Sequence, residues 1–172
     1  SIVEKRLTMA FLKGEKNVIK GEVTSNHGYY ESLDDRAYLK EKGKDAFFDK
    51  IKTNYGTDYE ISEPGIDSLK QLDNPIAVYY DIALKENTED VIYFNPVLVP
   101  FYKENPFTAA VRRYPVEMPY KIDETFMLRM QLPDGYVVDE LPKSTRVKFN
   151  DDEGIFEYLV SSSDGIIQLR TR

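Results

Sequence analysis

The chain offers few residues whose chemistry could support catalysis. It contains one histidine, His27, and no cysteine, so the chain has no thiolate nucleophile, disulfide or cysteine-ligated metal, and any Ser-His-Asp arrangement must include His27. His27 stands between Asn26 and Gly28 at the expected end of a strand. Because no other motif supports a general base there, the sequence favours a turn histidine that is packed or on the surface.

The acidic residues do not form a catalytic pattern either. Asp34 and Asp35 are adjacent, as are Asp151 and Asp152, and neighbouring residues of a strand point to opposite faces, so such a pair cannot flank one bond. The segment "NDDEG" at 150–154 lacks the ligand spacing of a calcium loop and indicates a solvated hairpin turn. The 9 glycines form no phosphate-binding motif. We therefore predict no catalytic residue, no metal ligand and no cofactor.

The most distinctive stretch is "ENPFTAAVRRYPVEMPY", residues 104–120. Its adjacent arginines stand among prolines and aromatic residues, an arrangement that suits an anion site, a peptide-recognition motif or a stiff joint. Adjacent side chains diverge in an extended chain, and proline fixes φ and removes a backbone donor, so the sequence favours the joint. The residues predicted to form this structural motif are Asn105, Pro106, Phe107, Arg112, Tyr114, Pro115 and Val116.

The overall composition is that of a globular protein with a substantial core. The 172 residues are 41% hydrophobic and 13% aromatic, with a formal net charge of −7. No Lys/Arg-rich block is present, which disfavours nucleic-acid binding. The longest uncharged run, residues 91–102, contains two prolines and is shorter than the roughly 18 apolar residues of a membrane-spanning helix, so we predict no membrane span.

The first half of the chain predicts strands and a helical region. Alternating Leu7, Met9 and Phe11 followed by "KGEKN" and "VIKGEVTSN" indicate a β-hairpin. Residues 34–56 predict one helix broken near Gly43, or two short ones, ending at Gly56. Further strands are predicted at "TDYEISEPGIDSL", interrupted at its Pro-Gly pair, at "PIAVYYDIAL", and at "DVIYFNP", residues 90–96.

The second half predicts short strands separated by turns. The strand-like segments are "ETFMLRMQL", "YVVDEL" (136–141), "TRVKFN", "IFEYLVSS" and "IIQLRTR". Two Asp-Gly pairs suit tight turns between them, which indicates an antiparallel sandwich.

The predicted fold class is α+β, mostly β: antiparallel β-sandwich-like sheets with one or two helices in the N-terminal half. We divide the chain into a helix-bearing β subdomain at 1–103, a proline-bracketed connection at 104–120 and an antiparallel β-sandwich subdomain at 121–172 that ends within its last strand.

Several segments occur in an order that resembles a known family. They are "GEVTSNHGYYESLDDR", "KTNYG", "LKQLDNPIAVYYDI", "YFNP", "ENPF", Arg112 with "YPV", and "LRMQLPDGYVVDELP". From Gly21 to its end, the chain resembles the region that follows the catalytic core in large bacterial exported proteins with a transglutaminase-like (papain-type) domain. The catalytic Cys, His and Asp of that family belong to the preceding domain.

The resemblance implies a β-rich domain of unknown function that acts as a non-catalytic accessory or scaffold. Its partner would be the upstream transglutaminase-like domain of the same chain, and its location the periplasm or the cell exterior. The alternative is an independent glycan- or peptide-binding β-sandwich module that uses tyrosines or the edge of the final sheet. A self-contained hydrolase built on carboxylates is the least favoured function.

Overall fold

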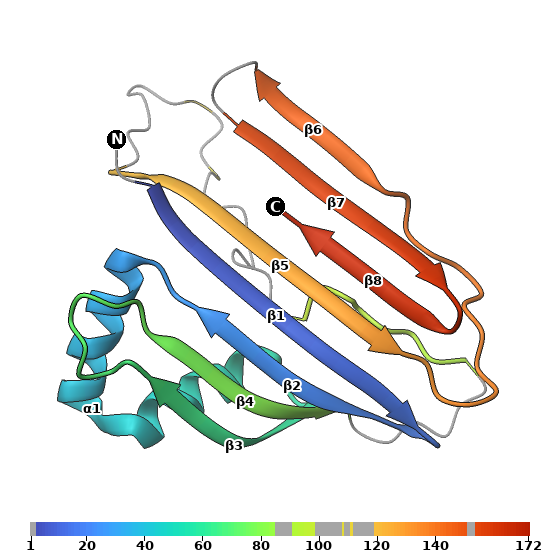
Figure 1. Cartoon of the computed structure of the whole chain (residues 1–172), viewed down its shortest axis with the longest axis horizontal. Coiled ribbons are helices and arrows are strands. Elements are labelled where there is room, and N and C mark those ends of the chain that lie inside the picture. The colour runs from blue at the N-terminus through green and yellow to red at the C-terminus, as the bar shows by residue number, and fades with distance from the viewer. Residues whose placement is uncertain (1–2, 85–90, 99–107, 109–110, 112–118, 151–153) are drawn as a thin grey trace.

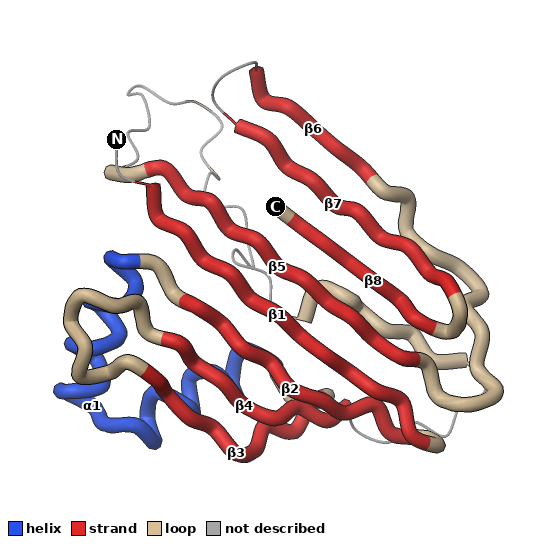
Figure 2. Tube along the Cα trace, viewed as in Figure 1, coloured by secondary structure: helices blue, strands red, loops and turns tan. Residues whose placement is uncertain are grey.

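The structure is a computed structural model that describes residues 3–84, 91–98, 108, 111, 119–150 and 154–172. These residues form one sheet of eight strands and one long kinked helix (Figures 1 and 2). The elements are β1 (Val3–Glu15), β2 (Val18–Asn26), α1 (Tyr29–Tyr55), β3 (Tyr59–Asp67), β4 (Ala77–Leu84), β5 (Lys121–Gln131), β6 (Thr145–Asn150), β7 (Gly154–Ser163) and β8 (Ile166–Thr171). The strand order is β3-β4-β2-β1-β5-β8-β7-β6. The prediction of a mostly β protein is confirmed.

The hydrophobic alternation of the first half places one face of the sheet in the core. β1 and β2 form the predicted antiparallel hairpin, and β4 pairs with the other edge of β2. In "PIAVYYDIAL" every second residue from Ile76 to Ile82 is buried, with Ile76 0% and Val78 1% exposed, and Leu84 is partly buried. β3 has the predicted interruption, since its register with β4 shifts between Ser62 and Gly65.

The helix is broken at the predicted glycine. Gly43 has φ 84° and ψ 171°, whereas the residues on either side are helical. This is a region of backbone space that residues with a Cβ rarely adopt. The kink lets both halves of α1 pack on the sheet: Leu39 is buried from the first half, and Phe47 and Tyr55 from the second. The helix ends at Gly56, as predicted.

Two side chains tie the first half of α1 to the loop that leads into β4. The Arg36 guanidinium donates to the carbonyls of Ser68, Leu69, Gln71 and Asn74 at 2.7 to 3.1 Å. The buried Ser32 Oγ accepts the backbone N–H of Ile76 at 2.9 Å. The first half of α1 is thereby anchored by polar contacts to chain that lies more than thirty residues away.

The expected sandwich and its purely antiparallel pairing are not confirmed. The strands of both halves join a single sheet, and β1 pairs with β5 in parallel from Val3↔Lys121 to Lys13↔Gln131. This pairing continues the core face, because Phe126, Leu128 and Met130 extend the row of buried side chains that starts on β1. The sequence interpretation assumed that strands pair with their neighbours in sequence, and it could not detect a match across more than one hundred residues. The bounds proposed for the three parts of the chain stay a prediction.

Two predicted strands do not form. The first was expected at "DVIYFNP", residues 90–96, but the described residues 91–98 contain no strand. The second was expected at 136–141, which also contains no strand. In the second segment Val138 packs against the core whereas Val137 is 84% exposed. The alternation of buried and exposed valines is therefore present without a partner strand, because β8 occupies the position beside β5. No helix within the described ranges has the length and apolar character needed to cross a bilayer.

Candidate functional site

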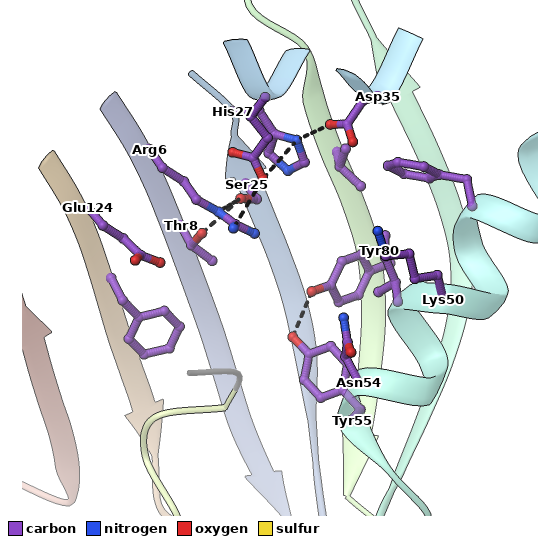
Figure 3. A pocket seen from close by; sticks show the side chains of 15 residues that line it. Arg6, Thr8, Ser25, His27, Asp35, Lys50, Asn54, Tyr55, Tyr80 and Glu124 are labelled. Carbon is purple, nitrogen blue, oxygen red and sulfur yellow. Dashed lines mark hydrogen bonds and ion pairs between the residues drawn. The ribbon is translucent and has the colours of Figure 1, made fainter. Parts of the chain in front are cut away.

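A cavity of about 370 Å³ lies between α1 and the core face of the sheet (Figure 3). Its polar lining consists of Arg6, Thr8, Ser25, His27, Glu31, Asp35, Lys50, Asn54 and Glu124. Its apolar and aromatic lining consists of Phe47, Ile51, Tyr55, Val78, Tyr80 and Phe126. These residues come from β1, β2, β4, β5, both halves of α1 and the turn between β2 and α1. The parallel pairing of β1 with β5 brings Glu124 and Phe126 beside Arg6 and Thr8.

The start of α1 is positioned by a carboxylate from β1. The buried Glu4 accepts the backbone N–H groups of Tyr30 at 3.1 Å and Glu31 at 2.9 Å. Gly28 at the N-cap supplies no side-chain hydrogen bond, and a Cβ there would lie 2.2 Å from Glu4 Oε1. Glu4 therefore caps the helix from another strand, where a negative charge is also favoured by the helix dipole.

His27 is a packed turn histidine, 7% exposed, at the junction of β2 and α1. Its backbone N–H donates to the carbonyl of Ile76 at 2.9 Å. Its Nδ1 shares a hydrogen bond of 2.5 Å with Asp35 Oδ2. Nothing in the sequence indicated Asp35 as its partner, because His27 lies before the predicted helix of residues 34–56 and the contact depends on how β2 leads into α1.

Arg6 holds the centre of a second polar network. Its Nη1 lies 3.1 Å from Glu31 Oε1, and its Nε donates to Ser25 Oγ at 3.3 Å. Ser25 Oγ also shares a hydrogen bond of 2.8 Å with Thr8 Oγ1. Within the described ranges, no hydrogen bond joins Ser25 to His27. The two residues therefore do not form the nucleophile–base pair that a serine hydrolase requires.

His27, Glu31 and Asp35 form the group in the described part of the chain that could hold a metal ion. Their ligand atoms all lie within 4.8 Å of one another. Each of them already has a protein partner, since His27 is bonded to Asp35, and Glu31 is paired with Arg6. A cation there would lie beside the Arg6 guanidinium, so an ion-pair network accounts for the cluster better than a metal site.

Two tyrosines close the cavity with a buried hydrogen bond. The hydroxyl oxygens of Tyr55 and Tyr80 are 2.6 Å apart. Burial is the largest cause of the raised pKa of both phenols. Both therefore stay protonated at neutral pH and act as hydrogen-bonding groups rather than as bases.

Glu124 of β5 differs from the other charged residues of the lining. It is half-buried, and burial raises the pKa of its carboxyl, an effect that Arg6 opposes and Glu31 reinforces. In the structure as described, its side chain takes part in no hydrogen bond or ion pair. The carboxyl thus faces the cavity as an acceptor without a protein donor.

The predicted structural motif cannot be placed. Asn105, Pro106, Phe107, Arg112, Tyr114, Pro115 and Val116 all lie outside the described residues.

Comparison with known proteins identifies part of the chain. Residues 90–172 match the model of the DUF3858 family, a domain of unknown function with a solved structure. The match includes β5 to β8 and supports the prediction of a β-rich domain of unknown function. No curated protein and no solved structure is significantly similar to the chain.

Proposed function

We propose that this chain is a non-catalytic accessory or scaffold domain of a larger transglutaminase-like protein. It has no activity of its own, packs beside the upstream transglutaminase-like domain of the same polypeptide, and functions in the periplasm or outside the cell. The ordered motifs from Gly21 onward and the absence of cysteine support this function. The observation that carries it is the pairing within the cavity, where Arg6, Glu31, His27, Asp35 and Ser25 stabilise one another and present no activated nucleophile.

The surface best suited to the upstream domain is the β6–β7 end of the sheet. On β7, Tyr158 and Val160 pack against the core, and Phe156 lies on the same face but is 52% exposed. Opposite Phe156 on β6 is Val147, which is 53% exposed, and Phe149 is 81% exposed. The apolar core face therefore continues to the edge of the sheet as an exposed patch, a feature typical of interaction surfaces.

Binding of the two parts in trans tests the proposal. This chain and the segment that directly precedes it in the parent protein are produced separately and titrated by isothermal calorimetry. We expect saturable binding that Phe156→Ser weakens at least tenfold, since about 1.4 kcal/mol corresponds to a factor of ten. Val137→Ser is the matched control, because Val137 is 84% exposed and lies outside the strands.

Two results contradict the proposal. One is a parent reading frame without a Cys/His/Asp-bearing domain upstream of this chain. The other is an upstream segment that folds but does not bind, or that binds the Phe156→Ser variant as tightly as the original.

The second candidate is an independent peptide- or glycan-binding module. β6 is an edge strand with all six residues exposed, and an unpaired edge can accept an added strand. The tyrosine pairs are less suited to sugar stacking: Tyr80 is buried beside the exposed Tyr79, and the Tyr30 ring stacks on Tyr120 at 4.8 Å. Retention of peptides or glycans by the isolated chain on arrays would favour this candidate, and retention of neither would exclude it.

A further inference from the structure

The parallel pairing of β1 and β5 places Arg6 directly opposite Glu124. The two side chains nevertheless form no ion pair, because the Arg6 guanidinium is paired with Glu31. It is also directed to Ser25 (Figure 3). Arg6, which is paired with Glu124 in the sheet, therefore already forms an ion pair with Glu31. This leaves Glu124 as the carboxylate of the cavity whose hydrogen-bonding capacity is not used by the described residues.

The charge balance of the cavity is negative. Glu31, Asp35 and Glu124 line it together with Arg6. Lys50 also lines the cavity; it is exposed, and its Nζ is 5.5 Å from the centre of the Tyr38 ring. With His27 neutral, three carboxylates line the cavity against the two cations Arg6 and Lys50, and this excess of negative charge favours a cationic ligand and disfavours an anionic one.

The walls beside Glu124 are aromatic rather than polar. Phe126 follows two residues later on the same face of β5, and Tyr80 stands across the cavity. Aromatic faces attract organic cations and pack against their alkyl groups. A metal ion of the hard type would need several oxygen ligands, and Glu124 offers only its own carboxylate. A volume of about 370 Å³ is sufficient for a small organic molecule.

We propose that this cavity binds a small primary alkylammonium compound. The ammonium group donates hydrogen bonds to the Glu124 carboxylate, and the alkyl chain packs against Phe126 and Tyr80. The site is independent of the accessory role, because the cavity is lined by β4, β2, β1 and β5, whereas the patch lies on β7 and β6 at one edge of the sheet. Either proposal can therefore fail without the other.

Calorimetric titration of the 172-residue chain with n-pentylammonium chloride tests the site. Phosphate buffer is used because amine buffers would compete. We expect saturable one-to-one binding, at least tenfold weaker binding of 1-pentanol, and none of pentanoate. Glu124→Gln should weaken pentylammonium binding about tenfold or more, as expected for the loss of a hydrogen bond to a charged group.

The matched control is Glu22→Gln. Glu22 is exposed on β2 and alternates with the buried Val23, so its side chain points to the opposite face of the sheet. Its replacement should leave binding unchanged. Absence of saturable binding, equal binding of 1-pentanol, or unchanged binding by Glu124→Gln would each overturn the proposal.

A second variant keeps the test decisive if Glu124→Gln does not fold. Asn54→Phe adds a ring to the helix wall of the cavity and leaves Glu124 in place. Circular dichroism confirms its fold. We expect it to abolish pentylammonium binding, and retained binding by the folded variant would refute the location of the site.

Discussion

Removal of the Arg36 guanidinium should destabilise the protein by about 3 kcal/mol. Two of its four acceptors, the carbonyls of Ser68 and Leu69, are in part-buried contacts, whereas those of Gln71 and Asn74 are in exposed contacts. A hydrogen bond to a charged group contributes about 1.5–3 kcal/mol, and carbonyls that can rebind water recover most of that. If only the two part-buried contacts are counted and their contributions are not fully additive, Arg36→Ala should lower the free energy of unfolding by about 2–4 kcal/mol.

Urea unfolding followed by circular dichroism measures this loss. The midpoint should fall while the slope with denaturant stays the same, because the surface exposed on unfolding changes little. Arg129→Ala is the control: Arg129 is exposed on β5 and its side chain makes no hydrogen bond or ion pair with the described residues, so its loss should change stability by less than about 0.5 kcal/mol. Equal losses for the two variants would refute the assignment of Arg36 as the residue that anchors the loop before β4.

Three further changes have expected outcomes. Ser32→Ala leaves the buried N–H of Ile76 without its acceptor and should cost about 1–3 kcal/mol in urea unfolding. Gly43→Ala meets no atom within 4 Å, so its expected cost of about 1–3 kcal/mol in the same assay arises from backbone strain at φ 84°. Glu124→Gln should leave thermal stability nearly unchanged at pH 4 and raise it at pH 7.5. Burial raises the pKa of Glu124 above its ordinary value of 4.5, so the folded state binds more protons than the unfolded state and wild-type stability falls as pH rises through this range.

Matched variants check the reason for each outcome. Ser161→Ala removes an exposed hydroxyl, and a loss as large as that of Ser32→Ala would contradict the role of burial. Gly154→Ala is the control for the kink, since its Cβ would meet an atom only at 3.7 Å and its φ is not in the left-handed range. If Glu124→Gln changes thermal stability equally at both pH values, the raised pKa is not the cause.

Local patterns predicted most of the elements in the first half of the chain. Period-two alternation marked the β1–β2 hairpin and the buried face of β4, and the glycines at 43 and 56 marked the kink and the end of α1. These features can be predicted from the sequence because each depends on residues that are close together in the chain. The same reasoning placed strands at 90–96 and 136–141, where alternation occurs but no partner strand is available.

The candidate site could not be predicted from the sequence, because its residues are far apart in the chain and come together only in the folded structure. Arg6, His27, Asp35 and Glu124 carry no motif, and each would be a surface charge or a turn residue by itself. The sequence prediction centred instead on the segment with Arg112 and Arg113, which both lie outside the described residues.

The sequence by itself determined that the chain is mostly β, that its helix breaks at a glycine, and that it has no cysteine nucleophile. Only the tertiary structure decided that both halves share one sheet and that a cavity forms where α1 covers the strands. The reason is that alternation fixes which face of a strand is buried but not which strand lies beside it. The β1–β5 pairing decides that choice, and it sets Glu124 opposite Arg6 while the start of α1 draws Arg6 toward Glu31.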